Sequence, residues 1–199
     1  MTFERNTFAG MTDYTGVALA DILVHLREWE QSTVDTAAKL QGHLVRAQAA
    51  ADRLERPREV FAFCSRFSAL FARYAADLHR LVTELPNGVR EAHVKIVRQL
   101  YESARHEDDS ILRFRNDCVY DSVKDESLRP LLELIYTDAR EVVVDFQDLS
   151  NLAPRLETFV GSETPREIFT DLHLKPNLFG IGWNLNRTLG RLSKWWESR

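Results

Sequence analysis

The sequence predicts an all-α protein, an antiparallel bundle of four to five long helices with a short helical C-terminal extension. Its 199 residues include only eight glycines and six prolines, which is too few for the many tight turns of a β-sandwich or barrel. Apolar residues also recur at steps of three and four along most of the chain, as they do on the buried side of a helix. Hydrophobic and charged fractions of 44% and 28% are ordinary for a globular protein, so a full core is expected.

The first long pattern covers Val17–Ala49, and Asp13 or Thr15 is placed to cap it. The pattern weakens near Gln31-Ser32-Thr33, where the helix either continues or breaks. Pro57 then marks a boundary, because proline suits the first turn of a helix.

The second helix has the clearest pattern in the chain. Its apolar residues alternate at steps of four and three, which predicts a seam packed against neighbouring helices: Val60, Cys64, Phe67, Phe71, Tyr74, Leu78 and Leu81. The segment Leu85-Pro86-Asn87-Gly88 has the composition of a turn. The helix expected next, over residues 89–104, therefore runs antiparallel to it.

A turn is expected at the acidic segment 106–109, followed by a short helix over residues 110–121 and a long helix over residues 128–146. The character of the sequence changes after Leu149. We expect a linker or bend at 150–154, a short helix over 164–172, and a basic amphipathic helix over 187–199. The predicted units are a bundle domain over residues 1–150 and an extension over residues 151–199.

Composition excludes several functional classes. A formal net charge of −4 gives no overall electrostatic attraction to nucleic acid, although a local basic patch can still bind phosphate. Two cysteines outside any metal-binding spacing indicate reduced thiols in a cytoplasmic protein. The histidines form no His-x-x-x-His pair, no phosphate-binding glycine loop is present, and no apolar run is long enough to span a bilayer. We therefore predict no metal, no cofactor, no transmembrane segment and no cleaved signal peptide.

One stretch, Asp109–Asp121, gathers arginines, an amide, acids and a phenol on the predicted short helix. At helical spacing, Arg113 pairs with Asp117, and Asn116 pairs with Tyr120. Arg115 directly precedes Asn116. Arginine offers a planar fork of donors suited to phosphate, so this helix is the candidate site.

At these residues the chain resembles the HEPN superfamily, all-α domains of prokaryotic toxins, anti-phage defence proteins and RNA-cleaving enzymes. Its signature is an arginine, often followed by a polar residue, and then a histidine on the same helix. Arg115 and Asn116 match the first two positions, and Tyr120 stands where the histidine is expected. The resemblance covers about residues 58–150. It implies a homodimer in which two such helices meet, in a defence or toxin–antitoxin setting.

The absence of a histidine at position 120 affects the nuclease activity that the resemblance would otherwise imply. Catalytic members of the family are thought to act on RNA without a metal, and a histidine can take and give a proton near neutral pH. A tyrosine has an ordinary pKa of about 10 and is a poor base at pH 7. The resemblance thus implies a binding or dimerisation domain with lost or weakened nuclease activity.

Two alternatives stay open: a metal-independent endoribonuclease that uses Arg115 with Tyr120 or His106, and a helical scaffold without a chemical site. The segment 187–199 joins tryptophans to basic residues. It is expected to pack on the bundle, to bind a partner protein or, less readily, to contact a membrane surface or nucleic acid.

Overall fold

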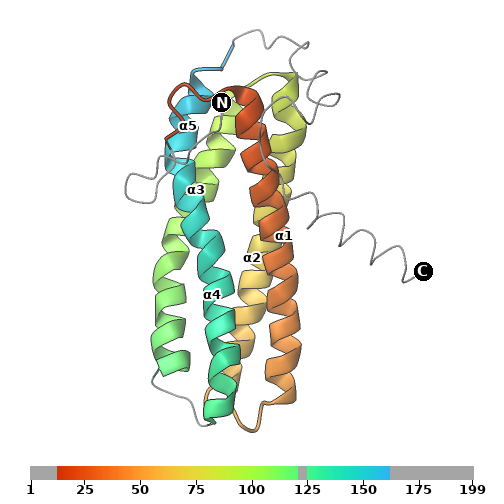
Figure 1. The fold of residues 1–199 in the computed structure, drawn as a ribbon, viewed down its shortest axis with the longest axis vertical. Coiled ribbons are helices and arrows are strands. Elements are labelled where there is room, and N and C mark those ends of the chain that lie inside the picture. The colour runs from red at the N-terminus through yellow and green to blue at the C-terminus, as the bar shows by residue number, and fades with distance from the viewer. Residues whose placement is uncertain (1–12, 121–124, 162–199) are drawn as a thin grey trace, which may run out of the picture.

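The computed structural model describes residues 13–120 and 125–161, which form an antiparallel helical bundle (Figure 1). Each long helix runs opposite to the one before it, and short 3₁₀ turns follow or precede the helices at 85–87, 126–128 and 146–148. This architecture confirms the predicted all-α fold. The α-helices are α1 (Leu19–Ala49), α2 (Pro57–Glu84), α3 (Glu91–Phe114), α4 (Arg129–Asp145) and α5 (Leu149–Glu157).

The seam predicted on α2 is the centre of the core. All seven of its residues are buried. The rings of Phe63 and Phe114 stack with centroids 4.0 Å apart, which joins α2 to α3. Tyr74 stacks on Phe146 at 5.2 Å, which joins α2 to the end of α4. Because offset aromatic pairs add to the free energy gained by burial, these two contacts hold three helices around one axis.

The first helix is continuous from Leu19 to Ala49, with no break at residues 31–33. Thr33 is buried in this part of the helix, so packing holds it helical despite the polar sequence. Neither Asp13 nor Thr15 caps α1. Asp13 instead accepts a hydrogen bond from the backbone N–H of Thr15 at 2.8 Å, in the turn before the helix, and this bond lowers the pKa of its carboxyl group.

The connection between α2 and α3 is tied by a buried histidine. Nδ1 of His93 accepts a bond from the backbone N–H of Arg90 at 3.1 Å, so Nε2 is free to donate to Glu84 at 3.1 Å. Bonds from Arg80 and His93 lower the pKa of the Glu84 carboxyl group. Gly88 has φ of +118°, a conformation that other residues rarely adopt, and it ends the 3₁₀ turn as the sequence predicts.

The chain does not bend or unwind at residues 150–154. These residues lie in α5, and Leu152, Ala153 and Leu156 are buried against the bundle. Pro154 is on the exposed side of this helix, where it is tolerated. Helix α5 packs on α3, so the bundle continues past the boundary predicted at residue 150. The helices predicted over 164–172 and 187–199 lie outside the described residues.

Within the described ranges, none of the helices combines the length and apolar character required to cross a membrane.

The burial of the seam predicts how much stability the protein loses when one of its aromatic rings is removed. Phe67 is fully buried between Phe63 and Phe71. Phe67→Ala should lower the free energy of unfolding by about 3–5 kcal/mol, because it removes buried surface and leaves a cavity. Urea denaturation followed by circular dichroism measures this change. Ala72→Ser, an exposed site on the same helix, serves as control. An equal, small loss in both variants would contradict the central role of the seam.

Candidate functional site

The candidate site lies in a π-helical turn at the end of α3. The helix runs without interruption through residues 106–110, so the predicted acidic turn and the separate short helix after it are wrong. The π-helical segment Arg115–Tyr120 follows directly. Single π turns inside helices often occur at functional sites, because they change which side chains face each other.

A side chain from α4 stabilises this turn. Nη1 of Arg129 donates to the backbone carbonyl of Val119 at 3.1 Å. The same guanidinium binds both carboxylate oxygens of Glu126, at 2.7 and 2.8 Å. These bonds lower the pKa of Glu126 and raise that of Arg129, so the pair stays charged and holds the carbonyl at the helix end.

The π turn changes the partner of Tyr120. Backbone bonds in a π-helix join residues five apart, so Arg115 and Tyr120 face each other. The Arg115 guanidinium lies 4.8 Å from the centre of the Tyr120 ring. The predicted pairing of Asn116 with Tyr120 assumed ordinary α spacing and stays a prediction. Asn116 is exposed beside the contact of Arg115 with Tyr120.

A second tyrosine, from α4, completes the site. The Arg115 guanidinium also lies 5.0 Å from the centre of the Tyr136 ring. Nη1 of Arg140 donates to the Tyr136 hydroxyl at 3.0 Å, and its guanidinium lies 6.0 Å from the same ring. The cluster Arg115, Tyr120, Tyr136 and Arg140 is called the arginine–tyrosine cluster below. Sequence reasoning missed Tyr136 and Arg140, although their spacing of four residues on a predicted helix was visible.

The charge of this cluster is open to solvent. Tyr120 is 50% exposed, and Arg115 and Arg140 are half-buried. Across the described residues, no ion pair joins either arginine to a carboxylate, nor does one join Arg113 to Asp117. Cation–π contact orients a guanidinium without neutralising it, so the cluster can accept an anion.

The predicted auxiliary residue His106 lies away from the cluster. It is an exposed residue of α3, nine positions before Arg115. At a rise of about 1.5 Å per residue it is roughly 13 Å away along the helix and half a turn around it. Its neighbour Glu107 forms an ion pair with Arg66 of α2, so this part of the helix serves packing between helices.

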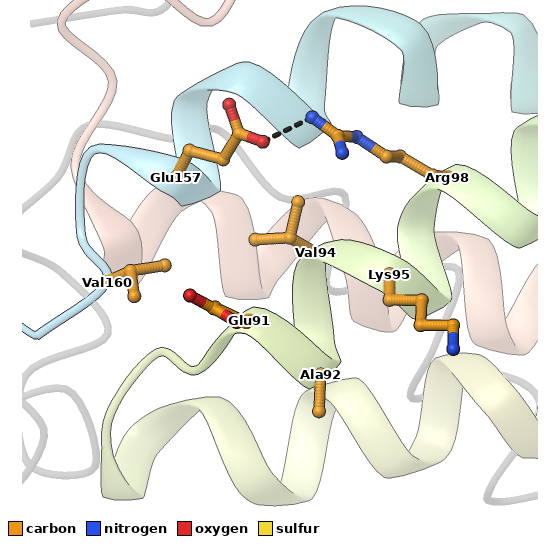
Figure 2. A pocket seen from close by; sticks show the side chains of 7 residues that line it. All are labelled: Glu91, Ala92, Val94, Lys95, Arg98, Glu157 and Val160. Atoms are coloured by element: carbon orange, nitrogen blue, oxygen red, sulfur yellow. Dashed lines mark hydrogen bonds and ion pairs between the residues drawn. The ribbon is translucent and has the colours of Figure 1, made fainter.

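Two open clefts lie near α3, and neither includes Arg115 or Tyr120. The larger, of about 650 Å³, lies between α3 and the end of α5 (Figure 2). The ion pair between Arg98 and Glu157 crosses from one helix to the other there, as Figure 2 shows. The smaller cleft, of about 270 Å³, lies between α2 and the π turn, where Asp117 and Cys118 line it with Phe63.

Several buried polar side chains join helices of the bundle to one another. Nε2 of His43 on α1 lies 2.7 Å from Oδ2 of Asp138 on α4, and Lys39 lies 3.4 Å from the other carboxylate oxygen. Ser68 of α2 donates to the backbone carbonyl of Ala37 at 2.9 Å. In the part of the chain that the structure describes, no three His, Cys, Asp or Glu side chains are grouped to hold a metal ion.

Both cysteines are buried and free. Burial raises the pKa of the Cys64 thiol to about 12 and that of Cys118 to about 11. At about pH 8, neither thiol should react quickly with a disulfide reagent such as DTNB in the native protein, because the thiolate is the nucleophile. Both should react once guanidinium chloride unfolds the chain. A rapid native reaction of either thiol would contradict this burial.

The raised pKa values of the two thiols determine whether the stability of the protein rises or falls with pH. A folded thiol with a raised pKa keeps its proton at a pH where the unfolded thiol, with an ordinary pKa of about 8.5, loses it. The stability that these thiols contribute is therefore present below about pH 8.5 and falls as the pH rises towards 11–12. Denaturant unfolding of the Cys64→Ala and Cys118→Ala variants should show a smaller decrease in the free energy of unfolding over this pH range than the wild type shows.

Comparison with known proteins gives no further guide to this site, because no family model, no curated protein and no solved structure matches the chain.

Proposed function

We propose that this chain is a HEPN-like helical domain, non-catalytic or weakly active, that contacts RNA through the arginine–tyrosine cluster in a prokaryotic defence or toxin–antitoxin setting. One observation carries the proposal. The Arg115 guanidinium lies near two tyrosine rings at the surface of the bundle, with Asn116 exposed beside it.

The chemistry of this cluster suits single-stranded RNA. A guanidinium held by aromatic rings keeps its charge and its N–H groups for a phosphate. The half-exposed ring of Tyr120 offers a face on which a base can stack. Asn116 adds a neutral donor and acceptor next to the charge. Phosphate binding and base stacking together are the usual elements of RNA recognition without sequence specificity.

The residues of the cluster support binding more than cleavage. RNA cleavage without a metal needs a group that exchanges a proton near neutral pH. Tyr120 occupies the position of the family histidine, and a phenol has an ordinary pKa of about 10. His106 is roughly 13 Å along the helix from Arg115, too far for the two to act on one phosphate.

Two alternatives are each favoured by an observation. The direct contact of Arg115 with Tyr120 favours a metal-independent endoribonuclease in which the pair acts on one phosphodiester. The contact of Arg115 with Tyr136 favours a scaffold, because there the guanidinium fixes the π turn to α4. A homodimer and a protein partner bound through residues 187–199 complete the proposal.

RNA binding tests the proposal. Arg115→Ala should weaken the affinity for a short single-stranded RNA about tenfold and lower the salt dependence of binding by about one counterion, because one phosphate contact is lost. Tyr120→Ala should weaken binding and leave the salt dependence unchanged. Fluorescence anisotropy over a range of salt concentrations measures both quantities.

The matched control is Arg113→Ala, which removes an exposed arginine two residues away that contacts neither tyrosine. It should retain most of the affinity. If wild type and all three variants bind RNA equally, or if none binds, the scaffold alternative replaces the proposal.

Cleavage separates the binding domain from the nuclease. Purified protein is incubated with mixed RNA in EDTA, beside the Arg115→Ala variant. We expect no cleavage, or slow cleavage that the variant abolishes. Fast cleavage by the wild type that requires both Arg115 and Tyr120 would establish the endoribonuclease instead.

A further inference from the structure

The cleft of about 650 Å³ between α3 and α5 lies where the described chain ends. Val160 lines this cleft, and Gly161 is the last described residue. Figure 2 shows the side chains of Val94, on α3, and Val160, after α5, pointing toward each other across the cleft. The part of the chain that follows Gly161 therefore starts at the edge of the cleft.

The side chains that line the cleft on both sides include apolar ones. Val160 is 36% exposed, although a valine is usually covered in a folded protein. Val94 is nearly buried but borders the cleft from α3, and Ala92 is exposed beside it. An open cleft with apolar side chains on two walls favours an occupant that brings apolar side chains of its own, because both surfaces then leave water.

Charged side chains surround this apolar lining. Arg98 and Glu157 neutralise each other in the ion pair that crosses the cleft. Glu91 and Lys95 are one turn apart on α3, and neither forms an ion pair within residues 13–120 and 125–161. The cleft thus offers one unpaired charge of each sign to an occupant.

The backbone turns away from the axis of α5 before the described chain ends. After the last residue of α5, the N–H groups of Thr158, Phe159 and Val160 each donate to the carbonyl three residues earlier. Gly161 then has φ of +74°. A glycine in this left-handed conformation commonly ends a helix and changes the direction of the chain. The chain therefore leaves α5 by turning and does not extend the helix into solvent.

The sequence that follows has the pattern of an amphipathic helix. The helix predicted over residues 164–172 places three large apolar side chains on one side: Ile168, Phe169 and Leu172. Only Ser162 and Glu163 separate it from Gly161. A connection this short places two successive helices beside each other, so the predicted helix falls next to α5 and the cleft.

We propose that the segment 162–172 of this chain folds back into the cleft between α3 and α5. Its apolar side packs against Val94 and Val160, which covers the exposed valine and extends the bundle beyond Gly161.

The charges of the segment match those at the rim of the cleft. On the predicted helix, Arg166 lies on one flank of the apolar side and Asp171 on the other flank. Glu91 and Lys95 are the unpaired charges that these residues meet, and each sign has a counterpart. Opposite charges on the two flanks select one orientation of the segment in the cleft.

The covalent connection distinguishes this occupant from a separate molecule. A segment that begins at the edge of the cleft is held there at a high effective concentration, of the order of millimolar for a short linker. A second copy of the chain or another protein has to find the same cleft without that advantage.

The docked segment leaves the arginine–tyrosine cluster open. Arg115 follows Lys95 by 20 residues along the chain, which is about 30 Å at the rise of a helix. RNA binding and docking of the segment are therefore tested independently, and either can fail while the other holds.

Limited digestion of the full chain with trypsin tests the docking. The bond after Arg166 should be cut slowly, because a docked helix does not fit a protease active site. Val160→Asp should raise the rate of this cut about tenfold, since it places a carboxylate in the apolar lining. The matched control is Val144→Asp on α4, a site of similar exposure (42%) away from the cleft, which should leave the rate unchanged.

Crosslinking identifies the occupant. A short bismaleimide should join Ala92→Cys to Leu172→Cys within one chain, whereas the two native cysteines are buried and react slowly. The control pair is Ala69→Cys with Leu172→Cys, in which the first cysteine is exposed on α2 outside the cleft. Gel electrophoresis separates links within one chain from links between chains.

Circular dichroism confirms that each variant is folded. Three results would overturn the proposal: a cut after Arg166 that is as fast in the wild type as in Val160→Asp, equal crosslinking in the two cysteine pairs, and crosslinks of the cleft pair that form only between chains. The last result would assign the cleft to a second copy of the chain.

Discussion

The aromatic seam of α2 is the constraint on which the rest of the structure depends. Phe63 packs on Phe67 of the seam and stacks on Phe114 at one end, and Tyr74 of the seam stacks on Phe146 towards the other. Because dense packing leaves few alternative positions for large rings, these contacts fix the axial positions of α3 and α4 against α2. The end of α3, where the candidate site lies, is held by Phe114, the residue directly before the π turn.

The π turn at the end of α3 brings Arg115 and Tyr120 into contact. In an α-helix, residues three and four apart share a face, and Arg115 would have turned away from Tyr120. One wider turn brings them together, and Arg129 stabilises it by binding the Val119 carbonyl. The arginine is then held by tyrosines from two helices and keeps its positive charge. Neither Arg115 nor Tyr120 lines either of the two clefts described above.

Buried polar groups fix how the helices of the bundle are aligned along their axes. The pair of His43 and Asp138 joins α1 to α4, and Ser68 joins α2 to the backbone of α1. A slip of either helix would leave a buried polar group without its partner, which costs more than the bond itself gains.

The sequence by itself determined the all-α class, the α2 seam, the boundary at Pro57 and the turn at Gly88, because these depend on local period and on the backbone limits of proline and glycine. It also pointed to Arg115, Asn116 and Tyr120. Only the tertiary structure decided that α3 continues through His106 and the acids after it, and that α5 crosses residues 150–154, since packing outweighs weak helix breakers. It alone supplied the π turn and the contacts of Tyr136 and Arg140, because no local period encodes which side chains from distant helices meet.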